Sequence, residues 1–150
     1  MPTVRAEALV PGPRAEAEAL FYDLRRWPAF VDGFGAVAKV DGTWPEAGSR
    51  VLWDSKPGGR GRVSEVVASH RAGEGQVVEV DDERLRATQT VTFAKQGEGV
   101  RISVSWEYEL KDVRFPTSLF VRRALGDSLR RTVLRYRVER MSDVDDTRQT

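Results

Sequence analysis

Residues 100–110 alternate between two kinds of side chain along their whole length. Apolar or aromatic residues occupy the even positions, and charged residues or serines occupy the odd positions. A period of two is typical of a strand in an antiparallel sheet that is covered on one side only. The alternation predicts that the covered face includes Ile102, Val104 and Trp106. The face toward water then includes Arg101, Ser103 and Ser105.

The N-terminal part of the chain combines one strand with two helical patterns. Residues 3–10 also alternate and predict a strand, which Pro11 ends. Apolar residues at helical spacing predict an amphipathic helix over residues 13–26. We expect Pro28 to end this helix, because proline disfavours the helical region for the residue before it. A second, short helix is expected over residues 28–34.

The middle of the chain, residues 36–110, is divided by clusters of turn-forming residues. The clusters are DGTWPEAG at 41–48, KPGGRG at 56–61, AGEG at 72–75, DDER at 81–84 and KQGEG at 95–99. Gly, Pro and Asp favour turns through backbone freedom and local side-chain hydrogen bonds. A spacing of about ten residues between them predicts consecutive antiparallel hairpins.

The C-terminal part predicts one long helix over residues 117–140. Its apolar residues fall on one stripe at 100° per residue, namely Val121, Leu125, Leu129, Val133 and Tyr136. Arginines lie mostly on the opposite side. Residues 142–150 have little to bury, so we expect them to form a disordered tail after a single domain of residues 1–141.

The composition narrows the classes of site that the chain can hold. It has 150 residues, no Cys and one His, with a net charge of +1. These counts exclude disulfides, thiolate zinc sites and clusters of several histidines. No apolar run reaches the roughly 20 residues of a membrane span, and no secretory signal is evident. We therefore expect a cytoplasmic protein with no metal, no cofactor, no nucleic-acid partner and no integral membrane association, either a monomer or a homodimer.

Four segments, in this order of elements, resemble one known superfamily. They are RRWPAF at 25–30, GSRVLW at 48–53, VRISVSWEYEL at 100–110 and ALGDSLRRTVLRYRVE at 124–139. Over residues 3–140 the chain is similar to START-like (SRPBCC) proteins, in particular to the bacterial polyketide cyclase/dehydrase and lipid-transport group. The resemblance implies an α+β helix-grip fold. In that fold a curved antiparallel sheet of about seven strands wraps around a long C-terminal helix, with two short helices between strands 1 and 2.

The resemblance also implies a ligand cavity between the sheet and the C-terminal helix. Such cavities typically measure about 300–1,000 Å³. The candidate ligand-binding residues are Trp53, Gln89, Val91, Phe93, Val104, Trp106, Tyr108, Leu125, Leu129 and Tyr136. For the aliphatic members, ordinary core packing is the alternative. Trp106, Tyr108 and Gln89 are the stronger candidates, because each carries a polar atom that needs a partner when it is buried.

Three other features have both a functional and a structural interpretation. His70 suits general acid–base chemistry, but we expect an exposed turn residue. Residues 81–83 are three adjacent carboxylates, which we expect to be a solvated turn rather than a cation site. Eight arginines lie at positions 114, 122, 123, 130, 131, 135, 137 and 140. They suit either a surface for anionic lipid, RNA or an acidic partner, or a solvated helix face, which we expect.

The leading functional prediction is a carrier or sensor that binds a small hydrophobic or amphipathic molecule. The alternative is an aromatic polyketide cyclase or dehydratase that uses the same cavity. Its acid–base groups or donors would come from Gln89, Tyr108, Tyr136 and Arg62. A second alternative is an interaction protein that uses the basic helix face. Two or more polar groups converging in the cavity would favour chemistry, whereas a dry aliphatic cavity would favour carriage.

Overall fold

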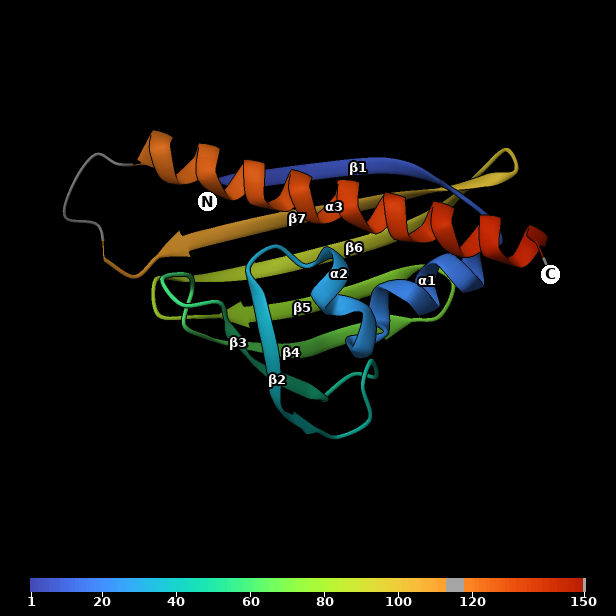
Figure 1. Ribbon diagram of the computed structural model, residues 1–150. Coiled ribbons are helices and arrows are strands. Elements are labelled where there is room, and N and C mark those ends of the chain that lie inside the picture. Colours follow the sequence, from blue (N-terminus) through green and yellow to red (C-terminus); the bar gives the residue numbers. More distant parts are fainter. Residues whose placement is uncertain (113–117, 150) are drawn as a thin grey trace.

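A seven-stranded antiparallel sheet curves around one long helix (Figure 1). The computed structural model describes residues 1–112 and 118–149. The elements in chain order are β1 (Thr3–Pro11), α1 (Arg14–Tyr22), the 3₁₀ turn η1 (Leu24–Arg26), α2 (Trp27–Phe30), β2 (Phe34–Asp41), β3 (Arg50–Ser55), β4 (Arg62–Arg71), β5 (Gly75–Asp81), β6 (Leu85–Gln96), β7 (Gly99–Leu110) and α3 (Ser118–Gln149).

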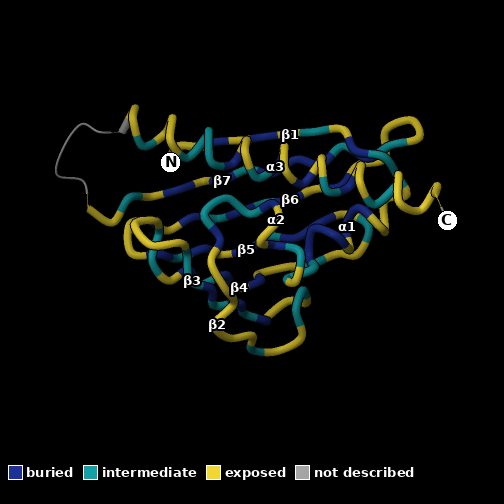
Figure 2. The backbone as a smooth tube through the Cα atoms, in the orientation of Figure 1, coloured by how far each residue is buried: buried dark blue, intermediate teal, exposed yellow. Residues whose placement is uncertain are grey.

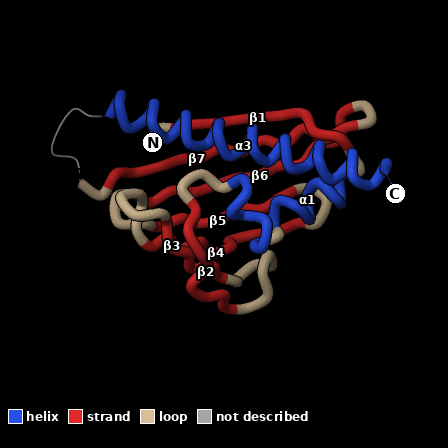
Figure 3. The backbone as a smooth tube through the Cα atoms, viewed as in Figure 1, coloured by secondary structure: helices blue, strands red, loops and turns tan. Residues whose placement is uncertain are grey.

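The strand order across the sheet is β1-β7-β6-β5-β4-β3-β2, so β1 and β2 form the two edges. All neighbours along β2 to β7 are consecutive in the chain, as the hairpin spacing predicts. Helix α3 runs along β1 and β7, whereas α1 packs against β6 and β7, and α2 packs against β2 and α3 (Figure 3). This arrangement is the helix-grip fold, and it confirms the predicted fold class.

The alternation along β7 sorts its side chains as predicted, with one difference. Ile102, Val104 and Trp106 are all buried beneath the helices. Ser103 belongs to the opposite set but is also buried, with only 8% of its surface exposed. Its register partners on the two neighbouring strands are Glu7 and Thr92. A serine is smaller than either residue, so these neighbours cover part of its surface.

The first predicted helix ends earlier than its apolar pattern suggests. Helix α1 stops at Tyr22, because the Asp23 carboxylate accepts a hydrogen bond from the Arg25 backbone N–H and starts the 3₁₀ turn. The expected break before Pro28 is wrong, since Trp27 keeps helical dihedral angles of −55° and −37°. Trp27 is buried and its indole N–H donates to the Phe21 carbonyl, which outweighs the local preference.

Helix α3 extends through Gln149 rather than ending near residue 140. Its start at residue 117 lies outside the described residues. Arg26 accounts for part of the extension, because it forms ion pairs of 2.8 Å with Glu139 and 2.9 Å with Asp143. Asp143 thus connects the extended part of α3 to η1, although this part has few apolar side chains to bury.

The predicted stripe of α3 faces the sheet. Leu129, Val133 and Tyr136 are buried, and Val121 and Leu125 pack against the core from less enclosed positions. Buried segments in Figure 2 run along the middle strands and the inner side of α3. No helix in residues 1–112 and 118–149 has the length and apolar character that a membrane crossing requires.

Candidate functional site

A cavity of about 70 Å³ lies between the sheet and α3. That is well below the roughly 300–1,000 Å³ of typical ligand pockets, so the predicted size is wrong. Its wall consists of Phe21, Trp27, Val31, Asp32, Trp44, Trp53, Arg60, Glu65, Gln76, Gln89, Val104, Trp106, Leu125, Ser128, Leu129 and Thr132. The volume is nevertheless enough for several water molecules, because one water needs roughly 10–15 Å³ in this measure.

All four tryptophans of the chain line this cavity. They come from α2, the loop between β2 and β3, β3 and β7. Trp27 and Trp44 contact edge to face, with ring centroids 5.6 Å apart. The indole N–H of each tryptophan donates to a protein acceptor, which is the Phe21 carbonyl, the Tyr22 carbonyl, Glu65 or Gln89. These bonds hold the rings in fixed orientations around the cavity.

The structure brings six of the ten candidate ligand-binding residues to the cavity wall. They are Trp53, Gln89, Val104, Trp106, Leu125 and Leu129. The other four, Val91, Phe93, Tyr108 and Tyr136, are buried but do not line it. Phe21 lies between the two regions, with its ring centroid 5.8 Å from Phe93 and 5.7 Å from Tyr136. It therefore fills the far end of the space between sheet and helix.

The candidate acid–base groups of the enzyme hypothesis do not gather at the cavity. Gln89 reaches it, where its side-chain oxygen accepts from the Trp106 indole N–H at 2.8 Å. The hydroxyl of Tyr136 donates instead to the Ala17 carbonyl on α1, and burial raises the pKa of this phenol. Arg62 is exposed and pairs with Asp54. Tyr108 lies elsewhere in the core.

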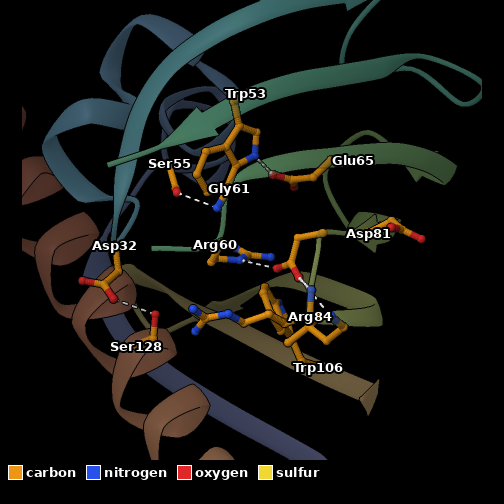
Figure 4. A network of polar contacts seen from close by, with 12 residues as sticks. Asp32, Trp53, Ser55, Arg60, Gly61, Glu65, Asp81, Arg84, Trp106 and Ser128 are labelled. Carbon is orange, nitrogen blue, oxygen red and sulfur yellow. Dashed lines mark hydrogen bonds and ion pairs between the residues drawn. The ribbon is translucent and has the colours of Figure 1, made fainter. Parts of the chain in front are cut away.

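Three ionisable residues that were not candidates from the sequence line the cavity, namely Asp32, Arg60 and Glu65, and all three are labelled in Figure 4. Arg60 comes from the glycine-rich loop between β3 and β4. Its guanidinium carbon lies 5.3 Å from the ring centroid of Trp53 and 4.9 Å from that of Trp106. Both distances are within the range of cation–π attraction. On its outer side, Nε donates to the buried carboxylate of Asp82 at 2.7 Å.

Glu65 is a buried carboxyl group on β4 whose Oε2 accepts from the Trp53 indole N–H at 2.6 Å. Burial raises the pKa of Glu65, while the Trp53 hydrogen bond and the positive charge of Arg60 oppose the rise. Burial therefore favours the neutral acid. A sequence signal for this residue existed, because Glu65 shares the alternating face of Val63 and Val67. Arg60 had no such signal, since a turn residue is normally solvated.

One side of the cavity is closed by contacts between Asp32 and α3. Ser128 donates to Asp32 at 2.6 Å, and the Asp32 backbone N–H donates to Thr132 at 2.9 Å. Arg131 and Arg135 pair with the same carboxylate. The hydrogen bond from Arg131 is the main cause that lowers the pKa of Asp32 to about 2. These contacts join the segment between α2 and β2 to the helix.

His70 is not the exposed turn residue that we expected. Only 7% of its side-chain surface is accessible, and it lies between two carboxylates. Its Nδ1 is 3.3 Å from Glu46 and its Nε2 is 3.8 Å from Glu18. The Tyr22 ring contacts it edge to face, and burial raises the pKa of that phenol. The partners come from α1 and from the loop between β2 and β3, so local sequence gave no indication of them.

The acidic turn at residues 81–83 is also only partly solvated. Asp82 is buried, where it pairs with Arg60 and accepts from the backbone N–H groups of Arg84 and Leu85. Among the described residues no group of three or more His, Asp or Glu is arranged to hold a metal ion. The role of Asp82 here is to hold Arg60 at the cavity.

Several arginines of the C-terminal helix face are engaged within the protein. Arg131 and Arg135 pair with Asp32, Arg130 pairs with Asp127, and Arg140 donates to Glu16 and to the carbonyls of Pro11 and Gly12. Arg114 lies outside the described residues. These ion pairs reduce the free positive charge of the helix and weaken the case for a basic interaction surface.

Several known structures share this helix-grip fold. The protein TTHA0849 from Thermus thermophilus has a TM-score of 0.71 and 18% identity, covering 95% of this chain and 99% of that one. Ara h 8.0201 has a TM-score of 0.69 and 14% identity, covering 93% and 97%.

Norcoclaurine synthase from Thalictrum flavum, in complex with dopamine and hydroxybenzaldehyde, has a TM-score of 0.59 and 15% identity, covering 85% of this chain and 84% of that one. No protein-family model and no curated protein matches the sequence. At such identities the likeness concerns the fold alone.

Proposed function

We propose that this protein binds a small hydrophobic or amphipathic molecule in the cavity between the sheet and α3, as a carrier or sensor. The observation that carries the proposal is the position of the four tryptophans, which all line one cavity. A core that only needs to be packed does not require its four largest rings around the same space. Norcoclaurine synthase, which shares the fold, holds two small aromatic molecules in its structure.

The present volume limits the size of the ligand or requires the cavity to widen. About 70 Å³ is too little for a sterol or a long acyl chain. Leu125 and Ser128 lie on α3 at the cavity, and Leu125 is only partly enclosed. A one-ring aromatic molecule would therefore require the smallest rearrangement of α3 and the segment that contains Asp32.

Tryptophan fluorescence tests this proposal directly. A thermal-shift screen of small aromatic molecules, aromatic polyketides, fatty acids, quinones and sterols would be followed by fluorescence titration of each hit. A ligand present at 100 times its Kd adds about 2.7 kcal/mol to folding, which raises the melting temperature by roughly 5–10 °C. Native mass spectrometry of the protein from its own host would identify a retained ligand.

Two substitutions make the screen specific to the cavity. Trp106→Ala removes a wall residue and should abolish the shift, whereas Arg130→Ala changes an exposed residue of α3 and should preserve it. A screen without hits, together with a native mass equal to that of the bare chain, would contradict the proposal.

An enzymatic role in the same cavity is the second candidate, a cyclase or dehydratase acting on a poly-ketone. The observation in its favour is that a guanidinium and a buried carboxyl group both line the cavity. A neutral carboxylic acid can donate a proton, and a guanidinium can stabilise an enolate oxygen. Mass analysis of each bound compound after incubation distinguishes the two roles, because a carrier returns its ligand unchanged. Glu65→Gln should stop any conversion while leaving binding intact.

A further inference from the structure

The guanidinium of Arg60 is fixed in place, but only one of its nitrogens, Nε, donates a hydrogen bond to a described residue. Asp82 holds Nε, and the Trp53 and Trp106 rings lie against the guanidinium. Figure 4 shows Arg60 between the two labelled indoles. An arginine held on its outer side and flanked by rings has lost most of its conformational freedom before any ligand arrives. Little further entropy is then lost when it forms a new contact.

The terminal nitrogens of this guanidinium have no hydrogen-bond acceptor among the described residues. Nε is the only nitrogen of Arg60 that donates to a protein group there, and Nη2 is buried without a partner. Buried polar groups in native proteins normally have a partner, and exceptions point to a water, an ion or a ligand. Arg60 lines the cavity, so an acceptor that binds there has an unpartnered N–H donor in the cavity wall.

The nearby carboxyl groups of Asp82 and Glu65 do not accept hydrogen bonds from the terminal nitrogens of Arg60. Asp82 already accepts from the backbone N–H groups of Arg84 and Leu85 at 2.7 and 2.9 Å, in addition to Arg60 Nε. Glu65 accepts from Trp53, and burial favours its neutral form. Burial therefore weakens the tendency of Glu65 to carry a negative charge that would repel an incoming anion.

The remaining wall selects a flat apolar group. Trp27 and Trp44 lie in the wall of the same cavity, and Phe21, Val31, Val104, Leu125 and Leu129 add further apolar side chains to it. The cavity therefore combines the unpaired N–H donors of Arg60 with aromatic and aliphatic side chains, and its wall also contains the polar side chains of Asp32, Glu65, Gln76, Gln89, Ser128 and Thr132. A planar guanidinium matches a carboxylate through two parallel hydrogen bonds better than it matches a single neutral oxygen.

We infer that the ligand is a small aromatic carboxylic acid, bound with its carboxylate against the terminal nitrogens of Arg60 and its ring among the tryptophans. The inference rests on the proposed function, since it names the class of molecule that the same cavity takes. It assigns Arg60 as the residue that distinguishes an acid from a neutral molecule of equal shape.

The test compares matched ligands by tryptophan fluorescence titration. Benzoate and 1-naphthoate are compared with benzamide and 1-naphthamide, which have nearly the same shape without the charge. Wild-type protein should bind each acid at least tenfold more tightly than its amide. Arg60→Met should remove this preference by weakening the acid alone. Arg50→Met is the matched control, because Arg50 also pairs with one aspartate but does not line the cavity.

Each outcome separates this inference from the proposed function. Amide binding equal to acid binding in the wild type overturns the carboxylate assignment and leaves the binding proposal standing. Equal weakening of acid and amide by Arg60→Met also overturns the assignment, since Arg60 would then only support the cavity. If no aromatic acid or amide binds while another class in the screen does, only the inference fails. If nothing in either set binds, both fail. Should Arg60→Met not fold, Arg60→Lys retains the charge without the planar fork and should reduce the acid preference.

Discussion

Ser128 on α3 donates a hydrogen bond of 2.6 Å to Asp32, which follows α2 more than ninety positions earlier in the chain. The same carboxylate pairs with Arg131 and Arg135 at 3.0 and 3.1 Å. Asp32, Ser128 and Thr132 all line the cavity as well. These bonds therefore join the segment between α2 and β2 to α3 at one side of the proposed binding site.

Asp32→Asn should destabilise the protein by about 1–2 kcal/mol at neutral pH, allowing for partial solvent screening of the charge. The pKa of Asp32 is lowered to about 2 in the folded state. A lowered folded-state pKa adds stability that is present above the ordinary aspartate pKa and is lost as the pH falls through the folded value. The difference between wild type and variant should therefore shrink from about pH 4 to about pH 2.

Urea denaturation across this pH range measures the Asp32 effect. Asp127→Asn is the control, because it removes an exposed ion pair with Arg130 on the same helix. Such pairs contribute about 0–1 kcal/mol. A difference between wild type and Asp32→Asn that stays constant down to about pH 2 would show that the charge of Asp32 is not what stabilises this contact.

Glu65→Gln should raise the melting temperature at neutral pH. Burial raises the pKa of Glu65 in the folded protein, so the folded state binds the proton more tightly than the unfolded chain. The stability of the wild type then falls as the pH rises from the ordinary glutamate pKa through the folded value, and glutamine removes that loss. Glutamine also keeps an oxygen to accept from the Trp53 indole N–H.

Thermal unfolding as a function of pH checks the Glu65 prediction, with Glu79→Gln as a control at an exposed position of β5. The wild type and Glu65→Gln should converge at acidic pH. A melting temperature that is lower in Glu65→Gln at every pH would mean that the ionised carboxylate stabilises the fold.

Leu129→Ala should destabilise the protein more than Leu125→Ala. Leu129 is buried, with 6% of its surface exposed, so its truncation should cost about 2–5 kcal/mol. Leu125 borders the cavity and is only partly enclosed, so we expect a smaller loss there. Arg130→Ala on the solvent side should change stability by less than about 0.5 kcal/mol. Equal denaturation midpoints for the three variants would contradict the assignment of Leu125 and Leu129 to the side of α3 that faces the sheet.

Tyr136→Phe should cost about 1–3 kcal/mol without affecting ligand binding. The hydroxyl of Tyr136 donates to the Ala17 carbonyl, and its loss leaves a buried acceptor with one partner fewer. Tyr136 is absent from the cavity wall, so the fluorescence titration should give the wild-type Kd. A changed Kd would show that the cavity extends past Phe21 toward Tyr136.

The architecture follows from patterns within single segments. A period of two over residues 100–110, turn clusters about every ten residues and a helical stripe from Val121 to Tyr136 are each local signals. They determine which face of each element is apolar, and a sheet with one apolar face must be covered by the available helices. This is why β7 and the inner side of α3 lie where the sequence places them.

The polar part of the site was decided only by tertiary structure. Arg60 and Asp82 lie in two different turns, where a charged residue is ordinarily solvated. In the folded protein their side chains form an ion pair that is largely shielded from water. His70 gains its carboxylates from α1 and from a distant loop. Phe21 decides that Phe93 and Tyr136 belong to packed core rather than to the cavity. The sequence by itself determined which side chains face inward, because that depends on local periodicity. Which inward residues meet, and how much space remains between them, depends on contacts between segments far apart in the chain.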